Sequence, residues 1–241
     1  MTRSTTEIIA HRGASRERRE NTLPAFALAL EHGADGIELD VHQTRDGTVI
    51  VHHDPVVQIE PGGPGLPLSA MTDAEVTSIR LPGGDALPTL DSVFELIGDR
   101  ATVYVEIKGS GMVASLVACL RRHGGARYAV HAFDHRMPVA VREALPGTDI
   151  GFLSASYPLD VAAVLRPAGA GALWQHQTLI DESLVQAAHS AGSRVIAWTE
   201  NDPTHARELI ALGVDALCTD TPAALRAALS RTAPDAPATR R

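Results

Sequence analysis

Eight strand-like segments alternate with eight helix-like segments along this 241-residue chain, and that alternation restricts its possible folds more than any other feature. Each short, β-branched segment is followed by an Ala- and Leu-rich segment of helical period. The predicted strands are 8–11, 36–42, 102–108, 128–133, 149–153, 172–175, 194–199 and 215–219. The predicted helices are 22–33, 89–98, 111–124, 135–145, 158–167, 181–191, 202–212 and 221–230. Eight units without a linker predict an α/β fold, a (βα)8 TIM barrel; a doubly wound open sheet is the competing architecture.

We expect one domain over residues 1–231, with a short insertion at about 54–88 and a tail at 232–241. The insertion lies between the second strand and the second helix, is rich in Pro and Gly, and contains one predicted helix near 73–79. Long loops in compact domains usually bind ligands or cover a site, so the insertion is a candidate binding element. The tail is rich in Ala, Pro and Thr, and its composition predicts disorder.

Helix boundaries can be predicted from side chains that cap the first turn and glycines that end the last one. The candidate N-cap residues are Asp91, Asp181 and either Asp202 or Thr204. The candidate stop residues are Gly33, Gly192 and Gly213. These signals support three starts and three ends, in four of the predicted helices.

The charge balance limits the classes of partner. The chain has 21 Lys and Arg residues against 29 Asp and Glu residues, a net charge of −8, which argues against a broad basic surface for nucleic acid or anionic lipid. Aromatic residues make up only 4% of the chain, which disfavours a base-stacking platform. Any phosphate chemistry therefore requires a local site, and the expected partner is a small molecule.

Two cysteines and the hydropathy pattern bear on location. Cys119 and Cys218 lie in apolar segments far apart in the sequence, which is typical of small buried residues in a reducing compartment. No run approaches the roughly 18 apolar residues of a membrane span, and no apolar signal core precedes the first strand. These features predict a cytoplasmic enzyme.

Residues 38–53 have the pattern of a β-hairpin, because Asp-Gly at 46–47 separates two alternating apolar runs. With a two-residue turn, residue i faces residue 93 − i, so Asp40 lies opposite His53. Glu38 then shares the face of Asp40, two residues away, whereas the histidine before His53 points to the other face. The pairing therefore predicts that two carboxylates and one histidine converge.

In a barrel of this kind the catalytic face is built from the carboxyl ends of the strands. The polar or aromatic residues at those ends are His11, Arg12, Glu38, Asp40, Glu106, Lys108, Trp198 and Asp220. Glu38, Asp40 and Glu106 are hard oxygen ligands suited to Mg²⁺ or Ca²⁺, and no clustered Cys/His set suggests Zn²⁺. Arg12 and Lys108 supply fixed positive charge for an anion.

Simpler interpretations exist for single residues. An acidic residue in a barrel strand can be half of a structural ion pair, His11 can be a core histidine, and Trp198 can be a packed aromatic residue. Three histidines near helix ends read as surface or dipole-capping residues: His32, His123 and His189. Five others have no assigned role: His42, His131, His135, His176 and His205. The coincidence of the charged residues on one face favours a functional site.

A set of short motifs, in order along the chain, resembles the glycerophosphodiester phosphodiesterase family. The motifs are His11-Arg12-Gly13, Glu20-Asn21-Thr22-Leu23, Glu38-x-Asp40-Val41, Thr44-x-Asp46-Gly47, His53-Asp54-Pro55, Glu106-Ile107-Lys108, Trp198-Thr199-x-Asn201, Gly213-Val214-Asp215 and Thr219-Asp220-x-Pro222. The resemblance runs from His11 to Pro222 and implies a (βα)8 barrel. After Pro55 the chain departs from the family's pattern, which leaves the alcohol group of the substrate open.

The resemblance also implies an activity and a set of roles. It implies metal-dependent hydrolysis of glycerophosphodiesters to sn-glycerol 3-phosphate and an alcohol, with His11 as general base and His53 as general acid. One divalent cation, Mg²⁺ or Ca²⁺, would be held by the carboxylates Glu38, Asp40 and Glu106. The substrate would be bound by Arg12, Lys108 and Trp198.

Two other functions remain open at this point. The same site could hydrolyse lysophospholipids in the manner of a phospholipase D, which would need an apolar groove that the Gly- and Pro-rich insertion is poorly equipped to form. The chain could instead be a non-catalytic phosphate-binding module, in which case a member of the set of two histidines and three carboxylates should be missing. None is missing.

Overall fold

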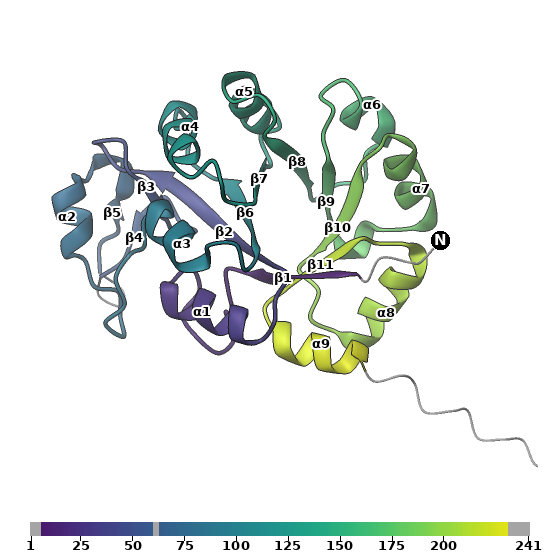
Figure 1. Cartoon of the computed structure of the whole chain (residues 1–241), viewed down its shortest axis with the longest axis horizontal. Helices are drawn as coiled ribbons and strands as arrows, with labels where there is room; N and C mark the ends of the chain where they lie inside the picture. The colour runs from purple at the N-terminus through teal and green to yellow at the C-terminus, as the bar shows by residue number, and fades with distance from the viewer. Residues whose placement is uncertain (1–5, 60–62, 231–241) are drawn as a thin grey trace, which may run out of the picture.

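The barrel predicted from the alternating segments is confirmed in the computed structural model, which describes residues 6–59 and 63–230 (Figure 1). Parallel strands follow one another in the order β1-β11-β10-β9-β8-β7-β6-β2, and β1 pairs with β2 to close the ring. These eight strands are β1 (Glu7–His11), β2 (Gly36–Gln43), β6 (Thr102–Ile107), β7 (Tyr128–Ala132), β8 (Asp149–Ser154), β9 (Ala172–His176), β10 (Arg194–Trp198) and β11 (Ala216–Thr219). Closure excludes the open sheet. The predicted tail at 232–241 lies outside the described residues.

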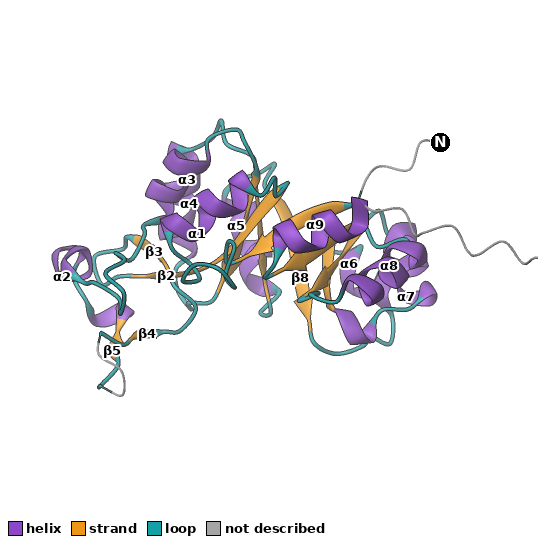
Figure 2. Cartoon of the chain, turned by 90° about the horizontal axis from the view of Figure 1, so that it is seen from below, coloured by secondary structure: helices purple, strands orange, loops and turns teal. Residues whose placement is uncertain are grey.

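Eight helices lie outside the ring, seven between consecutive barrel strands and α9 after the last one, as Figures 1 and 2 show. They are α1 (Leu23–Glu31), α3 (Leu90–Ile97), α4 (Val113–Arg122), α5 (Arg136–Ala144), α6 (Val161–Leu165), α7 (Glu182–Ser190), α8 (Pro203–Leu212) and α9 (Pro222–Ser230). A short 3-10 helix, η2 (Gln177–Leu179), precedes α7. Within the described residues, no helix has the length and apolar character needed to cross a membrane.

The predicted helix caps are partly right. Asp181 and Asp202 accept hydrogen bonds from backbone N–H groups at the starts of α7 and α8, as expected. The prediction for Asp91 is wrong, because the N-cap of α3 is Thr89, whose hydroxyl accepts a hydrogen bond from the backbone N–H of Ser92 at 3.1 Å. Asp91 lies in the first turn of α3, where its side chain is free to reach another helix.

Alternating strand residues build two apolar layers, one inside the barrel and one beneath the helices. In β1, for example, Ile9 belongs to the interior cluster, whereas Ile8 and Ala10 belong to the larger cluster that the helices cover. The interior cluster also contains Tyr104 and Trp174, which fill the barrel between the catalytic face and the opposite end. The catalytic face therefore has a packed floor.

The hairpin forms, but its predicted register is wrong by one residue. Strand β3 (Val49–Val51) pairs with β2 so that Val41 faces Val51, and residue i therefore faces residue 92 − i. The turn has three residues, 45–47, because Gly47 adopts a left-handed φ of 94° that closes a three-residue loop. In this register Asp40 is paired with His52 through a backbone hydrogen bond of 3.0 Å.

The insertion folds as a small unit beside the barrel, at the end of the molecule where Figure 2 labels α2. Its elements are β4 (Val56–Val57), β5 (Leu66–Pro67), η1 (Leu68–Ala70) and α2 (Asp73–Ser78), the last of which confirms the predicted helix. Eight buried apolar residues form a separate core there: Ile50, Val57, Leu68, Met71, Val76, Ile79, Leu81 and Leu87. These eight side chains thus pack within this small unit, whereas Ile59 and Leu66 of the insertion are exposed.

Candidate active site

A cavity of about 270 Å³ opens at the carboxyl ends of the barrel strands. Its lining comprises His11, Arg12, Glu38, His53, Glu106, Lys108, His131, Phe133, Leu153, Trp174, Trp198, Thr199 and Cys218. Seven of the eight predicted site residues are in this lining, and the eighth, Asp40, is fully buried and contacts Arg12 and Lys108. Among the described residues of the insertion at 54–88, none lines the cavity.

The turn after β1 places Arg12 at the cavity through an unusual backbone conformation. Arg12 has a φ of 57°, in the left-handed region that non-glycine residues seldom adopt, and Asn21 has a φ of 56°. The Arg12 N–H donates to the Glu38 carbonyl at 2.9 Å, and the Asn21 N–H donates to the Arg12 carbonyl at 3.0 Å. Next to it, a Cβ on Gly13 would lie 2.7 Å from the Ala25 backbone, so only glycine fits.

His11 is oriented by Asp220, which lies 209 positions away in the sequence. The Nδ1 atom of His11 is 2.7 Å from Oδ1 of Asp220. Burial raises the pKa of Asp220, but hydrogen bonds from His11, Asn201 and Ser15 outweigh it and lower the pKa to about 2. An ionised Asp220 accepts the Nδ1 proton, so the neutral ring presents an unprotonated Nε2, which lies 3.9 Å from Glu38.

His53 has a similar arrangement. Its Nδ1 atom is 2.8 Å from Oδ1 of Asp54, and its backbone carbonyl accepts a hydrogen bond from Nε2 of His42 at 3.0 Å. His53 lines the cavity although the hairpin register does not place it opposite Asp40, because β3 ends at Val51 and the chain turns away from the sheet. His42, which had no role from the sequence, thus supports the backbone of His53.

Glu38 and Glu106 are buried carboxylates without full charge compensation. Burial, together with repulsion from Asp40 and Glu106, raises the pKa of Glu38 well above its usual range. Burial and repulsion from Asp40 raise the pKa of Glu106 to about 7, although Lys108 donates to it at 2.9 Å. The ionised forms of Glu38 and Glu106 would be stabilised by a further cation in addition to Arg12 and Lys108.

Asp40 is held differently, because three donors surround it. Its oxygens lie 3.0 Å from Nε of Arg12, 3.5 Å from Nζ of Lys108 and 2.8 Å from Nδ2 of Asn21. Burial raises the pKa of Asp40, but the opposite charges of Arg12 and Lys108 and the bond from Asn21 outweigh it and lower the pKa. Asp40 is therefore ionised and fixes both cationic side chains at the cavity.

The donor set suits a divalent cation. One ligand atom each from Glu38, Glu106 and His131 lie within 4.8 Å of one another, and Oδ1 of buried Asp40 has no hydrogen-bond partner. Three carboxylates face only two cations, Arg12 and Lys108, so an added positive charge relieves repulsion. Glu38 and Glu106 thus fit the ion and His131 joins them in space, whereas Asp40, which is paired with Arg12 and Lys108, lies outside that group.

His131 is the member of the site that sequence reasoning missed. It lies within β7, a strand without a motif of its own, and β6 and β7 pair so that it sits beside Glu106. Its ring stacks on Trp174 at 4.1 Å with an interplanar angle of 6°. Burial lowers the pKa of His131 to about 3, so the ring is neutral.

The opposite wall of the cavity is aromatic. Trp198 contacts Phe133 edge-to-face at 5.5 Å and His176 at 5.3 Å, and Phe133 is 47% exposed. Nζ of Lys108 lies 6.0 Å from the Phe133 ring centre. The cavity is therefore lined by both charged and aromatic side chains, a combination that suits an anion with a small carbon skeleton.

Changing Asp220 to Asn tests the orientation of His11. We expect kcat to fall roughly 10- to 100-fold, because an amide holds the ring but no longer stabilises its protonated form. The measurement is kcat at saturating substrate. An unchanged kcat would show that Asp220 does not act through His11.

Comparison with known proteins agrees with this geometry. The sequence profile of the glycerophosphoryl diester phosphodiesterase family matches residues 11–224. A glycerophosphodiester phosphodiesterase from Caldanaerobacter subterraneus subsp. tengcongensis is 33% identical over 233 residues, which cover 91% of this chain and 96% of that protein.

Solved structures lead to the same family. An Oleispira antarctica phosphodiesterase in complex with the product sn-glycerol-3-phosphate has a TM-score of 0.85 and 26% identity, covering 93% of this chain and 97% of that one. A glycerophosphodiester phosphodiesterase from Agrobacterium tumefaciens has a TM-score of 0.80 and 27% identity, covering 92% of this chain and all of that one. This chain therefore belongs to the glycerophosphoryl diester phosphodiesterase family and is an enzyme of that family.

Proposed function

We propose that this enzyme hydrolyses glycerophosphodiesters to sn-glycerol 3-phosphate and an alcohol, using two histidines and one divalent cation, Mg²⁺ or Ca²⁺. The observation that carries the proposal is a single cavity lined by His11 and His53, each bound through Nδ1 to an aspartate. The sn-glycerol-3-phosphate bound to the Oleispira relative supports the product.

The two histidines act as general base and general acid. His11, whose Nε2 is left free by the bond to Asp220, accepts a proton from the attacking hydroxyl group. His53, bound to Asp54 and 35% exposed, donates a proton to the departing alcohol. This order follows the family resemblance. Either water or the 2-hydroxyl of the glycerol serves as the attacking group.

Arg12 and Lys108 bind the phosphate. Both side chains are held by Asp40, so their positions are fixed before the substrate arrives. Glu38, Asp40 and Glu106 would hold a divalent cation, which would supply further positive charge to stabilise the phosphate. Trp198 contacts the carbon skeleton of the substrate on the aromatic wall.

The affinity for the cation should rise with pH. The pKa of Glu106 is about 7, so Glu106 is partly protonated below neutrality, and the raised pKa of Glu38 acts in the same direction; a bound proton must leave before either group binds a cation. We therefore expect Mg²⁺ or Ca²⁺ to bind more weakly at pH 6 than at pH 8, with protons released on binding. Calorimetry in buffers of different ionisation enthalpy measures both quantities. Equal affinity at the two pH values would contradict this assignment.

A substrate panel tests the reaction itself. The purified enzyme is assayed with glycerophosphocholine, glycerophosphoethanolamine, glycerophosphoglycerol and a lysophospholipid, each with Mg²⁺, with Ca²⁺ or with a chelator. We expect release of sn-glycerol 3-phosphate from glycerophosphodiesters and loss of activity with the chelator. Activity that survives exhaustive chelation would overturn the role of the cation.

The lysophospholipid is the discriminating member of the panel. A cavity of about 270 Å³ is close in size to a small polar ligand, so an acyl chain would have to lie outside it. We expect the lysophospholipid to be a poor substrate. Preferred turnover of the lysophospholipid would support the phospholipase D-type alternative instead.

A cytoplasmic location is also part of our proposal, and it is supported by two free, buried cysteines.

A further inference from the structure

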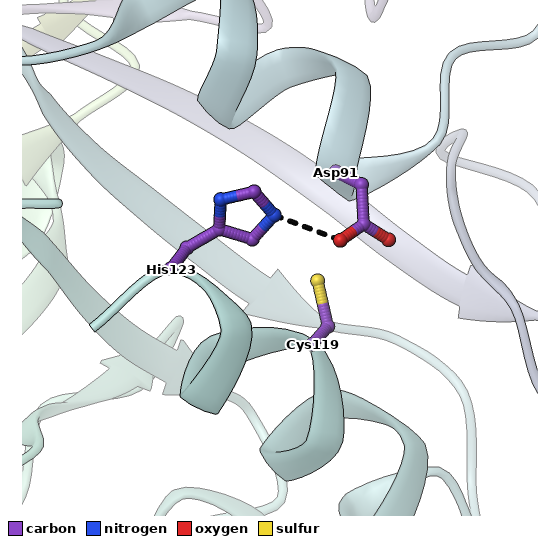
Figure 3. Close-up of side chains that lie close together, drawn as sticks. All are labelled: Asp91, Cys119 and His123. Atoms are coloured by element: carbon purple, nitrogen blue, oxygen red, sulfur yellow. Dashed lines mark hydrogen bonds and ion pairs between the residues drawn. The ribbon is translucent and has the colours of Figure 1, made fainter. Parts of the chain in front are cut away.

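A second group of metal-ligating side chains lies between α3 and α4, away from the cavity (Figure 3). It consists of Asp91 from the first turn of α3, Cys119 from α4 and His123, which caps the end of α4. None of the three lines the catalytic cavity. One ligand atom from each residue lies within 4.8 Å of the other two. We propose that Asp91, Cys119 and His123 form a zinc site that links α3 to α4.

The spacing of the residues suits one ion. Cys119 and His123 are four residues apart on one helix, so they lie on the same face, and Asp91 reaches them from the neighbouring helix. A tetrahedral zinc ion with Zn–S near 2.3 Å and Zn–N and Zn–O near 2.1 Å separates its ligand atoms by roughly 3.3–3.8 Å. The three ligand atoms now lie within 4.8 Å of one another, and Nε2 of His123 and Oδ1 of Asp91, hydrogen-bonded at 2.8 Å, would move slightly apart, so small side-chain shifts reach those values.

The chemistry of the donors selects the metal. A thiolate, an imidazole and a carboxylate together favour Zn²⁺ over Mg²⁺ or Ca²⁺, which prefer oxygen ligands. Three protein ligands leave the fourth tetrahedral position for a water molecule. The site thus differs in kind from the carboxylate site of the cavity.

The surroundings hold the ligands in place and leave a route for the ion. The His123 ring stacks on Phe94 with ring centres 4.8 Å apart, which fixes its orientation. Cys119 is fully buried, but the side chains of Asp91 and His123 are 30% and 21% exposed, so an ion can enter from solvent through them. Burial and the nearby Asp91 raise the pKa of the Cys119 thiol to about 12, so binding displaces one proton from sulfur to solvent.

Arg122 competes with the ion for Asp91. Its guanidinium makes three hydrogen bonds with the Asp91 carboxylate, two to Oδ1 at 3.1 and 3.0 Å and one to Oδ2 at 2.7 Å. The side chain is 57% exposed, so it can turn into solvent when a metal binds. Zn²⁺, a thiolate and a carboxylate sum to zero charge, so the metal-bound site does not repel Arg122. Because the guanidinium competes with the metal for the Asp91 carboxylate, its removal should strengthen metal binding.

Cobalt provides a spectroscopic test, because a cysteine thiolate bound to Co²⁺ gives an intense near-ultraviolet charge-transfer band that oxygen and nitrogen ligands do not. The full chain is stripped with a chelator and titrated with Co²⁺, and Zn²⁺ is then added in competition. We expect the band in the unmodified protein and its loss on addition of Zn²⁺. Cys119→Ser should abolish the band, whereas the matched control Cys218→Ser, at the catalytic cavity, should keep it.

Two further variants keep both cysteines, so the test does not depend on the folding of Cys119→Ser. His123→Gln should weaken Zn²⁺ binding at least about tenfold, and Arg122→Ala should strengthen it severalfold. In parallel, Zn²⁺ should raise Tm in the unmodified protein more than in His123→Gln. Absence of the band in the unmodified protein, persistence of the band in Cys119→Ser, or equal affinity in His123→Gln would each overturn the proposal. Glycerophosphodiester hydrolysis is measured separately and is independent of these outcomes.

Discussion

His11→Ala is expected to lower kcat for glycerophosphodiester hydrolysis by roughly 10²–10⁴-fold, and His53→Ala by a similar factor. Each substitution removes one of the two imidazoles proposed to transfer a proton: His11 carries the free Nε2 beside Glu38, and His53 carries the partly exposed ring bound to Asp54. Because both side chains are partly exposed, 21% for His11 and 35% for His53, both variants should keep the fold. The measurements are kcat at saturating substrate, with far-ultraviolet circular dichroism and Tm as checks of folding.

His189→Ala is the matched control for both variants. His189 also pairs with an aspartate, at 2.9 Å from Asp215, but it lies on α7 outside the cavity. We expect its activity to equal that of the unmodified enzyme. Near-normal turnover in His11→Ala or His53→Ala would reject the corresponding catalytic role, and a shift of the pH profile on one limb only would identify which histidine is the acid.

Glu38→Gln is expected to lower kcat/KM by roughly 10³-fold and to abolish tight binding of the divalent cation. The amide keeps the size of Glu38 but removes the charge that a metal requires, and a metal ion contributes several kcal/mol to stabilising a phosphoryl transition state. Since burial and repulsion raise the pKa of Glu38, the neutral amide should also leave the metal-free protein at least as stable. Calorimetric cation titration and Tm in the presence of a chelator measure these effects.

Glu208→Gln, at an exposed position of α8, is the control for the loss of one carboxylate. It should leave cation affinity, Tm and kcat/KM unchanged. If Glu38→Gln binds the cation as tightly as the unmodified enzyme, Glu38 is not a ligand. If it loses the cation but keeps its activity, the reaction does not use that ion, and the proposed mechanism fails at that step.

The hairpin illustrates where sequence reasoning reaches its limit. The Asp-Gly pair correctly predicted a turn at 46–47, but turn length decides register, and Gly47 closes a three-residue loop instead of a two-residue one. His53 nevertheless lines the cavity, because the strand ends before it. His53 lines the cavity and His52 does not, as predicted, but the predicted pairing of His53 with Asp40 is wrong.

Other contacts depended on packing between segments that are far apart in the chain. His131 carries no motif, and it joins Glu106 only because β6 and β7 pair in one particular register. Asp91 was predicted to cap α3, but Thr89 takes that place, which leaves Asp91 to meet His123 on α4. From the sequence, His123 was expected to be a surface residue and no Cys/His cluster suggested zinc. The packing of α3 against α4 brings a carboxylate, a thiol and an imidazole together.

The sequence by itself determined the barrel and the face on which the charged residues gather. Strand and helix periods are local properties, and in a parallel barrel the carboxyl ends of all strands meet at one face, so Glu38, Asp40 and Glu106 had to converge. Only the tertiary structure decided the partner of each group: Asp220 for His11, and Arg12 with Lys108 for Asp40. Those partners fix the tautomer and the ionisation state of each group. These two properties depend on distances of a few ångströms between residues that are remote in the sequence.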